Sequence, residues 1–218
     1  MRRAAALVVL LVAVLVLGVG QLVLPGLAAS TLRDRLAGSG RVLSVNVSAF
    51  PAIELLWHSA DRVVVRMASY RSPVSHLNSL LQDSRGVGTL VASVGVLRSG
   101  LLTLHDVTLT KQGSRLTGSG TLLESDLQAS VPFLRSVRLV SATSDSVTVA
   151  GTASALGVSA TVPATIRPEQ GRLVVVPDLP LGGFATVTVF SEPHVSVDGV
   201  GGRPIPGGIE MTARARFT

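Results

Sequence analysis

The sequence predicts a mainly β (α+β) protein with two or three short helices. Three observations predict this fold class. Apolar and polar residues alternate in many short segments, which is the pattern of half-buried strands. Helical patterns are scarce, and strands do not alternate with helices, so a doubly wound nucleotide-binding sheet is not expected. Of the 218 residues, 47% are hydrophobic and 15% are charged, which excludes an intrinsically disordered chain.

The chain begins with a basic and then apolar segment. Arg2 and Arg3 precede an apolar run from Ala4 to Leu24. As a helix this run would be about 31 Å long, close to the hydrocarbon thickness of a bilayer. We predict a transmembrane signal anchor, because a cleaved signal peptide usually has a shorter apolar region. Small residues at 28–30 leave cleavage open as the alternative. Both interpretations export the rest of the chain, because the two Arg residues stay on the cytoplasmic side.

Residues 1–30 therefore form the predicted signal anchor or signal peptide, and residues 31–218 form one β-rich domain. A short helix is predicted over Leu27–Ala37, because apolar residues recur there at helical spacing. The sequence Gly38-Ser39-Gly40 ends this helix.

Strand patterns dominate the remaining chain. The clearest alternation is at residues 43–49, 62–67, 102–109, 158–166 and 209–217. A bulge near His105-Asp106 would keep the third of these in phase. Six weaker strands are expected at residues 116–122, 137–141, 146–153, 172–176, 185–190 and 194–198. The glycine-rich sequences at 86–88 and 199–202 are interpreted as turns.

Two further helical segments are expected. One follows Ser72-Pro73, because four apolar residues fall on one face there. These four are Val74, Leu77, Leu80 and Leu81. The other is a single turn over Glu124–Ala129 with Ser125 as its cap.

No catalytic or metal-binding motif is present. The chain has no cysteine, which excludes a thiol nucleophile and a Cys-ligated metal. The pairs His58/Asp61 and His105/Asp106 fall short of the three or four converging ligands of a metal site. Aromatic residues make up 3% of the chain, which argues against a protein that stacks nucleic-acid bases. We therefore expect no enzyme activity, no cofactor, no metal and no nucleic-acid partner.

The most distinctive segment, residues 45–71, reads VNVSAFPAIELLWHSADRVVVRMASYR. A strand pattern ends at Phe50-Pro51, and an apolar helical turn follows. Large apolar side chains gather at this turn, namely Phe50, Ile53, Leu56 and Trp57. Two interpretations stay open. These side chains cap a hydrophobic core, or they line the mouth of an apolar lipid cavity.

Four short motifs, in the order in which they occur, cover most of residues 27–180. They are LAASTLRDRLAGSG after the basic and apolar start; V-x-V-x-x-F-P at 45–51 with D-x-V-x-V at 61–65; R-L-x-G at 115–118 with Asp126-Leu127; and G-R-L-V-V-x-P at 171–177. In this order the sequence resembles the LmeA-like family of phospholipid-binding proteins, which are exported proteins of actinobacterial envelopes.

The resemblance implies a long curved antiparallel sheet wrapped around the helices, similar to tubular lipid-binding folds. It implies non-catalytic binding of phospholipid, including phosphatidylinositol-type lipid, with a role in cell-envelope lipid or lipoglycan assembly. Phospholipid and membrane are the expected partners. The expected location is extracytoplasmic, either anchored in the membrane or, after cleavage, secreted into the envelope.

We predict that the lipid site includes two apolar segments of the chain. The residues concerned are Phe50, Ile53, Leu56, Trp57, Val74, Leu77, Leu80 and Leu81. Burial of acyl groups gains about 0.8 kcal/mol per CH₂, so an apolar groove alone could supply most of the affinity. The alternative is a structural or partner-binding β domain of the envelope. The segment Gly199–Gly208 falls outside the four motifs.

Overall fold

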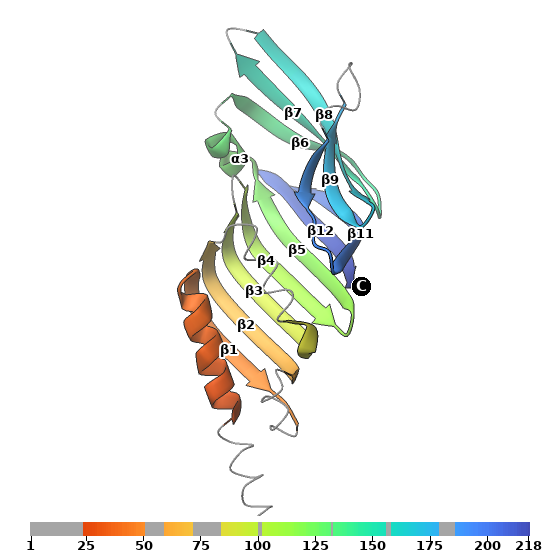
Figure 1. Ribbon diagram of the computed structural model, residues 1–218. Coiled ribbons are helices and arrows are strands. Elements are labelled where there is room, and N and C mark those ends of the chain that lie inside the picture. Colours follow the sequence, from red (N-terminus) through yellow and green to blue (C-terminus); the bar gives the residue numbers. More distant parts are fainter. Residues whose placement is uncertain are drawn as a thin grey trace, which may run out of the picture.

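The computed structural model describes residues 24–50, 59–71, 84–99, 102–131, 133–155, 158–178 and 186–218. These residues form two β-sheets and a helix over residues 24–37 (Figure 1). No helix within these ranges has both the length and the apolar character needed to cross a membrane. The predicted span at Ala4–Leu24 lies outside the described residues, apart from Leu24.

Sheet A has seven strands and sheet B has five. Across sheet A the order is β1 (Gly40–Ser48), β2 (Ala60–Arg71), β3 (Val87–Ser99), β4 (Leu102–Gln112), β5 (Arg115–Leu123), β12 (Gly208–Phe217) and β11 (Val195–Ile205). Across sheet B it is β10 (Val187–Phe190), β9 (Arg172–Pro177), β8 (Val158–Glu169), β7 (Val147–Ala155) and β6 (Leu134–Ala142). The 3-10 turn η2 (Ser84–Gly86) precedes β3, and helix α3 (Glu124–Ser130) joins β5 to β6.

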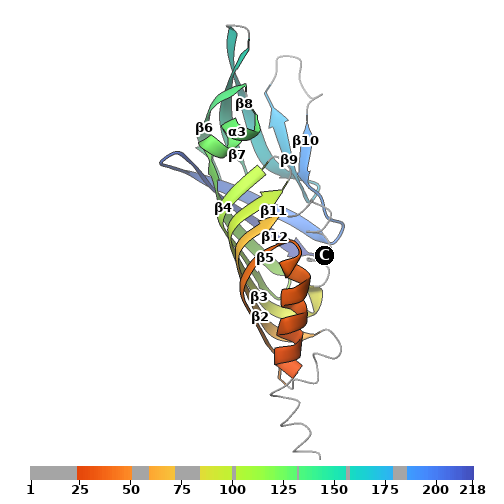
Figure 2. The same ribbon diagram turned by 90° about the vertical axis from the view of Figure 1, so that its left-hand side faces the viewer.

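The mainly β class is confirmed, and Figure 2 shows the curvature of sheet A. The expectation of one antiparallel sheet needs two corrections. The described strands form two sheets, and β2 pairs with β3 in parallel. A parallel pair needs a connection much longer than a hairpin turn, and residues 72–86 provide one between these strands.

All eleven predicted strands are present, but β3 was missed. Its inward residues Leu90 and Val94 alternate with Val91 and Ser93, so both of its faces carry apolar side chains. A strand of that kind lacks the alternation that predicts strands elsewhere in the chain. The bulge predicted at His105-Asp106 is confirmed, because Asp106 has a φ of 50° and the β4–β5 register shifts there.

The glycine-rich segment 199–202 was wrongly interpreted as a turn. It lies inside β11, and the turn between β11 and β12 comes later, where Gly207 has a φ of 73°. The other predicted turn, at 86–88, is confirmed in part: Gly86 ends the 3-10 turn η2, whereas Gly88 lies inside β3. The cap predicted for α3 was also wrong: its N-cap is Leu123, and no side chain caps this helix.

The helix over residues 24–37 packs on one face of sheet A, which we call the inner face. Leu36 is buried there together with the inward side chains of β1 and β2, among them Val45, Val65 and Met67. This confirms the helix predicted at Leu27–Ala37. The boundary predicted between residues 30 and 31 falls inside this helix.

Sheet B packs against the other end of the same inner face. Val147 of β7 is fully buried, and a Cβ added to Gly202 of β11 would come within 3.3 Å of it. Val200, the neighbouring inward residue of β11, is also buried. Figure 2 shows the helix and strands β9 and β10 on the same side of sheet A. The inner face is therefore covered at both ends by different elements.

Candidate functional site

The inner face of sheet A is apolar along a row that crosses all seven strands. The row consists of Val45, Val65, Ala92, Leu109, Gly118, Ala213 and Val200. Successive side chains of a strand point to opposite faces, so these positions share one face. A neighbouring row of Val94 and Val107 on β3 and β4, and of Met211 on β12, is apolar as well.

Burial varies along this row. Val45 and Val65 are buried at the helix end, and Val200 is buried at the sheet B end. The positions between them are only half-buried and include small residues. We call this half-buried region the central strip, formed by Ala92, Val94, Val107, Leu109, Gly118, Met211 and Ala213. From β3 to β12 it spans three strand spacings, or about 14 Å.

A charged residue of the inner face lies on the other side of the first row, away from Val94 and Val107. Lys111 of β4 is 3% exposed and faces Leu90 of β3 and Leu116 of β5. Its ammonium donates a hydrogen bond to the carbonyl of Val87 and lies 5.4 Å from the centre of the Phe217 ring. Burial lowers the pKa of Lys111, because desolvation disfavours the charged form.

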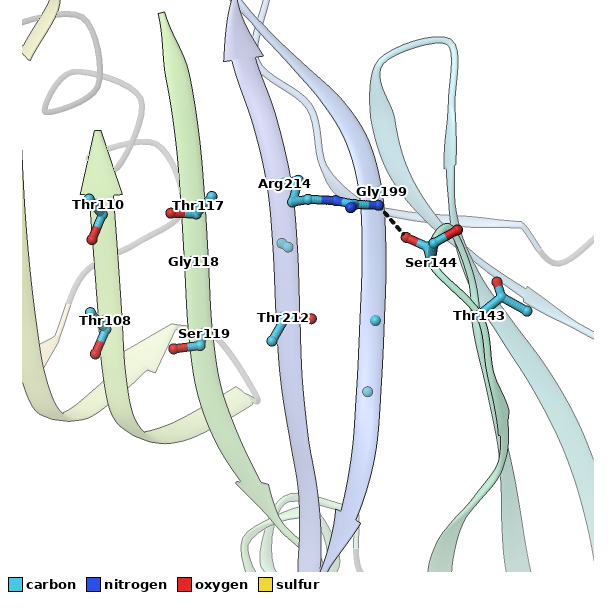
Figure 3. Close-up of a pocket in the computed structure, with 13 residues that line it drawn as sticks. Thr108, Thr110, Thr117, Gly118, Ser119, Thr143, Ser144, Gly199, Thr212 and Arg214 are labelled. Atoms are coloured by element: carbon cyan, nitrogen blue, oxygen red, sulfur yellow. Dashed lines mark hydrogen bonds between the residues drawn. The ribbon is translucent and has the colours of Figure 1, made fainter. Parts of the chain in front are cut away.

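The outer face of sheet A carries a groove of about 570 Å³ that is lined mainly by Thr, Ser and Gly residues (Figure 3). Its floor presents hydroxyl groups from three adjacent strands, namely Thr108, Thr110, Thr117, Ser119 and Thr212. The turn between β6 and β7 walls one side, where Arg214 donates a hydrogen bond of 2.7 Å to the Ser144 carbonyl. The hydroxyl groups of this surface can hydrogen-bond a polar group.

Glycines in β11 allow this turn to lie across the outer face. A Cβ at Gly199 would come within 2.8 Å of the Ser144 carbonyl oxygen, and one at Gly201 within 2.9 Å of the Thr212 hydroxyl. Side chains at these two positions would fill the groove. The glycines at positions 199 and 201 therefore leave the space in which the groove forms.

The predicted lipid-site residues fall largely outside the described part of the chain. Phe50 is described: it follows β1, is 79% exposed, and donates its backbone N–H to Asp61 at 2.6 Å. The others lie outside, namely Ile53, Leu56, Trp57, Val74, Leu77, Leu80 and Leu81. Their place in a lipid site remains a prediction. The central strip was not predicted, although small inward residues recur in the alternating patterns of β5 and β12.

Few titratable side chains meet in the described residues. His105 of β4 and Asp126 of α3 form one pair, with 2.7 Å between Nε2 and Oδ2. This contact ties α3 to sheet A. No group of three or more His, Cys, Asp or Glu that could hold a metal ion occurs in the described ranges.

Comparisons with known proteins assign no family. No family model matches the chain. No curated protein matches it either. One similar solved structure is a STAR-related lipid transfer protein from Xanthomonas axonopodis, with 15% identity over 52% of this chain and 76% of that chain. Its TM-score of 0.20 is too low to carry an argument. The resemblance to the LmeA-like family therefore stays a prediction.

Proposed function

We propose that this chain is a non-catalytic phospholipid-binding protein whose central strip contacts acyl chains. One observation carries the proposal: the central strip is apolar but only half-buried, whereas Val45 and Val65 at one end of the same row and Val200 at the other end are buried. Contiguous apolar surface that a protein leaves open is typical of a binding site. Small residues such as Gly118 and Ala213 leave room above the strip that larger side chains would fill.

The energetics fit an acyl ligand. Burial of a sixteen-carbon chain gains roughly 12 kcal/mol before the costs of ordering are subtracted. This is the scale of nanomolar binding, so apolar contact suffices and the headgroup needs only to provide selectivity. An acyl chain also makes no hydrogen bonds, which matches a central strip lined by Val, Leu, Met, Ala and Gly.

The finer proposal concerns the lipid and the cellular role. The resemblance to the LmeA-like family supports a phosphatidylinositol-type lipid and a role in envelope lipid or lipoglycan assembly. The apolar run at Ala4–Leu24, preceded by two Arg residues, supports an extracytoplasmic domain anchored in the membrane. Export also makes contact with nucleic acid improbable.

Native mass spectrometry of the full-length protein, released from a mild detergent, tests the proposal. We expect bound phospholipid, and exchange with fluorescent phosphatidylinositol or phosphatidylcholine gives its affinity. On β12, Ala213→Glu places a carboxylate on the central strip and should weaken binding at least tenfold. Thr212→Glu places the same group on the outer face and is the matched control, which should bind like the parent.

A second variant covers the case in which Ala213→Glu does not fold. Ala213→Leu adds only apolar volume, so it should keep the fold while it occludes the strip. Parent protein that carries no phospholipid and binds neither fluorescent lipid would overturn the proposal. It would then favour the alternative of a structural or partner-binding domain. Folded Ala213→Leu and Ala213→Glu variants that both bind phospholipid as tightly as the parent would remove the strip from the site.

A further inference from the structure

We infer that the end of the molecule where the helix over residues 24–37 begins and β1 ends is the surface that contacts the membrane. The inference rests on the membrane anchor of the proposed function and adds an orientation to it. Phe50 and Leu27 are the apolar side chains that this end offers to a lipid surface, and Arg62 pairs with Ser48 at the end of β1.

The path of the chain brings this end to the membrane. The apolar run ends at Leu24, and the helix includes that same residue, so no linker separates the two. After the helix, a turn at Gly38-Ser39 sends β1 back beside it, and the Ser39 N–H bonds the Leu36 carbonyl. The start of the helix and the end of β1 therefore lie at the same end of sheet A (Figure 1).

Exposed apolar side chains mark this end. Phe50 is 79% exposed, more than any other large hydrophobic residue in the described ranges, and Leu27 is 58% exposed. Phe50 is held in place, because its N–H bonds the Asp61 carboxylate and the β1–β2 register continues to Ser48 and Arg62. Its exposure is thus a feature of an ordered strand end. An aromatic ring in such a position is suited to the interface between headgroups and acyl chains.

The charge beside these residues fits the same partner. Arg62 is exposed next to the end of β1, where it can meet the phosphate of a lipid headgroup. The nearby Asp61 carboxylate already accepts the Phe50 N–H. Sheet B and α3 lie toward the opposite end of the molecule (Figure 1). A lipid that leaves the membrane would therefore reach the helix-covered end of the inner face before the central strip.

Single-cysteine variants of the full-length chain test this orientation, since the chain has no cysteine of its own. The probe is an environment-sensitive dye on Phe50→Cys, with the protein in phosphatidylcholine–phosphatidylglycerol vesicles that contain spin-labelled lipid. We expect a blue shift and at least twofold quenching. Leu43→Cys is the matched control: it lies on the same strand, is 58% exposed, and is about 23 Å away along β1. Val187→Cys reports on sheet B. Neither control should be quenched.

The outcomes separate this inference from the lipid-binding proposal. Quenching of the dye at position 50, without quenching at positions 43 and 187, supports the orientation. This holds even if the central strip proves to bind no phospholipid. Equal signals at positions 50 and 43, stronger quenching at 187, or no association with vesicles would overturn it. Phospholipid binding, measured separately by exchange, could still hold in each of those cases.

Discussion

The helix-covered part and the open part of the inner face are both apolar, but they differ in burial, and the open part includes small side chains. Under the helix the inward residues are large and buried, as Val65 and Met67 show. In the central strip the corresponding positions include Ala92 on β3 and Ala213 on β12, which are half-buried. Both parts follow the same strand alternation. The comparison teaches that alternation identifies the apolar face, whereas side-chain size and burial show which part of that face is filled by the protein itself.

Truncation in the covered part is expected to have the largest effect. Leu36 is 7% exposed and packs against the inward residues of β1 and β2. Leu36→Ala should lower the free energy of unfolding by about 2–5 kcal/mol, since it leaves a cavity between helix and sheet. Denaturant unfolding measures this. Leu43→Ala, at a 58% exposed position, should stay within about 0.5 kcal/mol. A loss of the same size in both variants would show that the helix does not pack as described.

Adding the same side chain to two glycines of the inner face should sharpen the comparison. A Cβ at Gly202 would lie 3.3 Å from both methyl groups of Val147, so Gly202→Val should cost about 1–3 kcal/mol through overpacking. At Gly118 the nearest atoms would be 3.8 Å away, so Gly118→Val should stay within about 1 kcal/mol of the parent. Thermal unfolding of the two variants gives the difference. A Gly118→Val loss as large as that of Gly202→Val would mean that the strip is filled.

Much of the fold was predictable from the sequence because burial on one face produces alternation. β12 is the clearest example: Ile209, Met211, Ala213 and Ala215 face inward, and polar residues lie between them. β3 failed this test because it carries apolar residues on both faces. The segment 199–202 failed for a different reason. Its glycines are required by packing between β11 and the β6–β7 turn, a contact between distant segments that no local pattern shows.

The candidate site was less predictable than the fold. Sequence reasoning favours large apolar side chains as ligand contacts, which led to Phe50 and its neighbours. The central strip instead includes small residues such as Ala92 and Ala213, which the strand register brings onto one face although their strands lie far apart in the chain. Lys111 could not be placed either. Its position in a β4 pattern suggests an inward side chain, but an inward lysine is rare unless its ammonium is accommodated.

The smallest expected effect concerns this lysine and appears only at alkaline pH. Burial lowers the pKa of Lys111 from its ordinary value of 10.5. Between the lowered pKa and 10.5 the unfolded chain binds more protons than the folded chain, so the free energy of unfolding rises with pH in this window. One group can contribute at most about 1.4 kcal/mol per pH unit. Lys111→Met removes the titrating group, so its stability should lack that rise.

Denaturant titrations at several pH values from 7 to 10.5 give the unfolding free energies of the parent and of Lys111→Met. The quantity of interest is the difference between these two free energies at each pH. The difference should change in favour of the parent as the pH rises, because only the parent gains stability from deprotonation. Arg115→Met is the control, since the same substitution removes a cation from an exposed position on β5. A difference that stays constant with pH would show that Lys111 titrates alike in the folded and unfolded chain. Its ammonium would then be hydrated, and the part of the inner face between Leu90 and Leu116 would be open to water rather than covered.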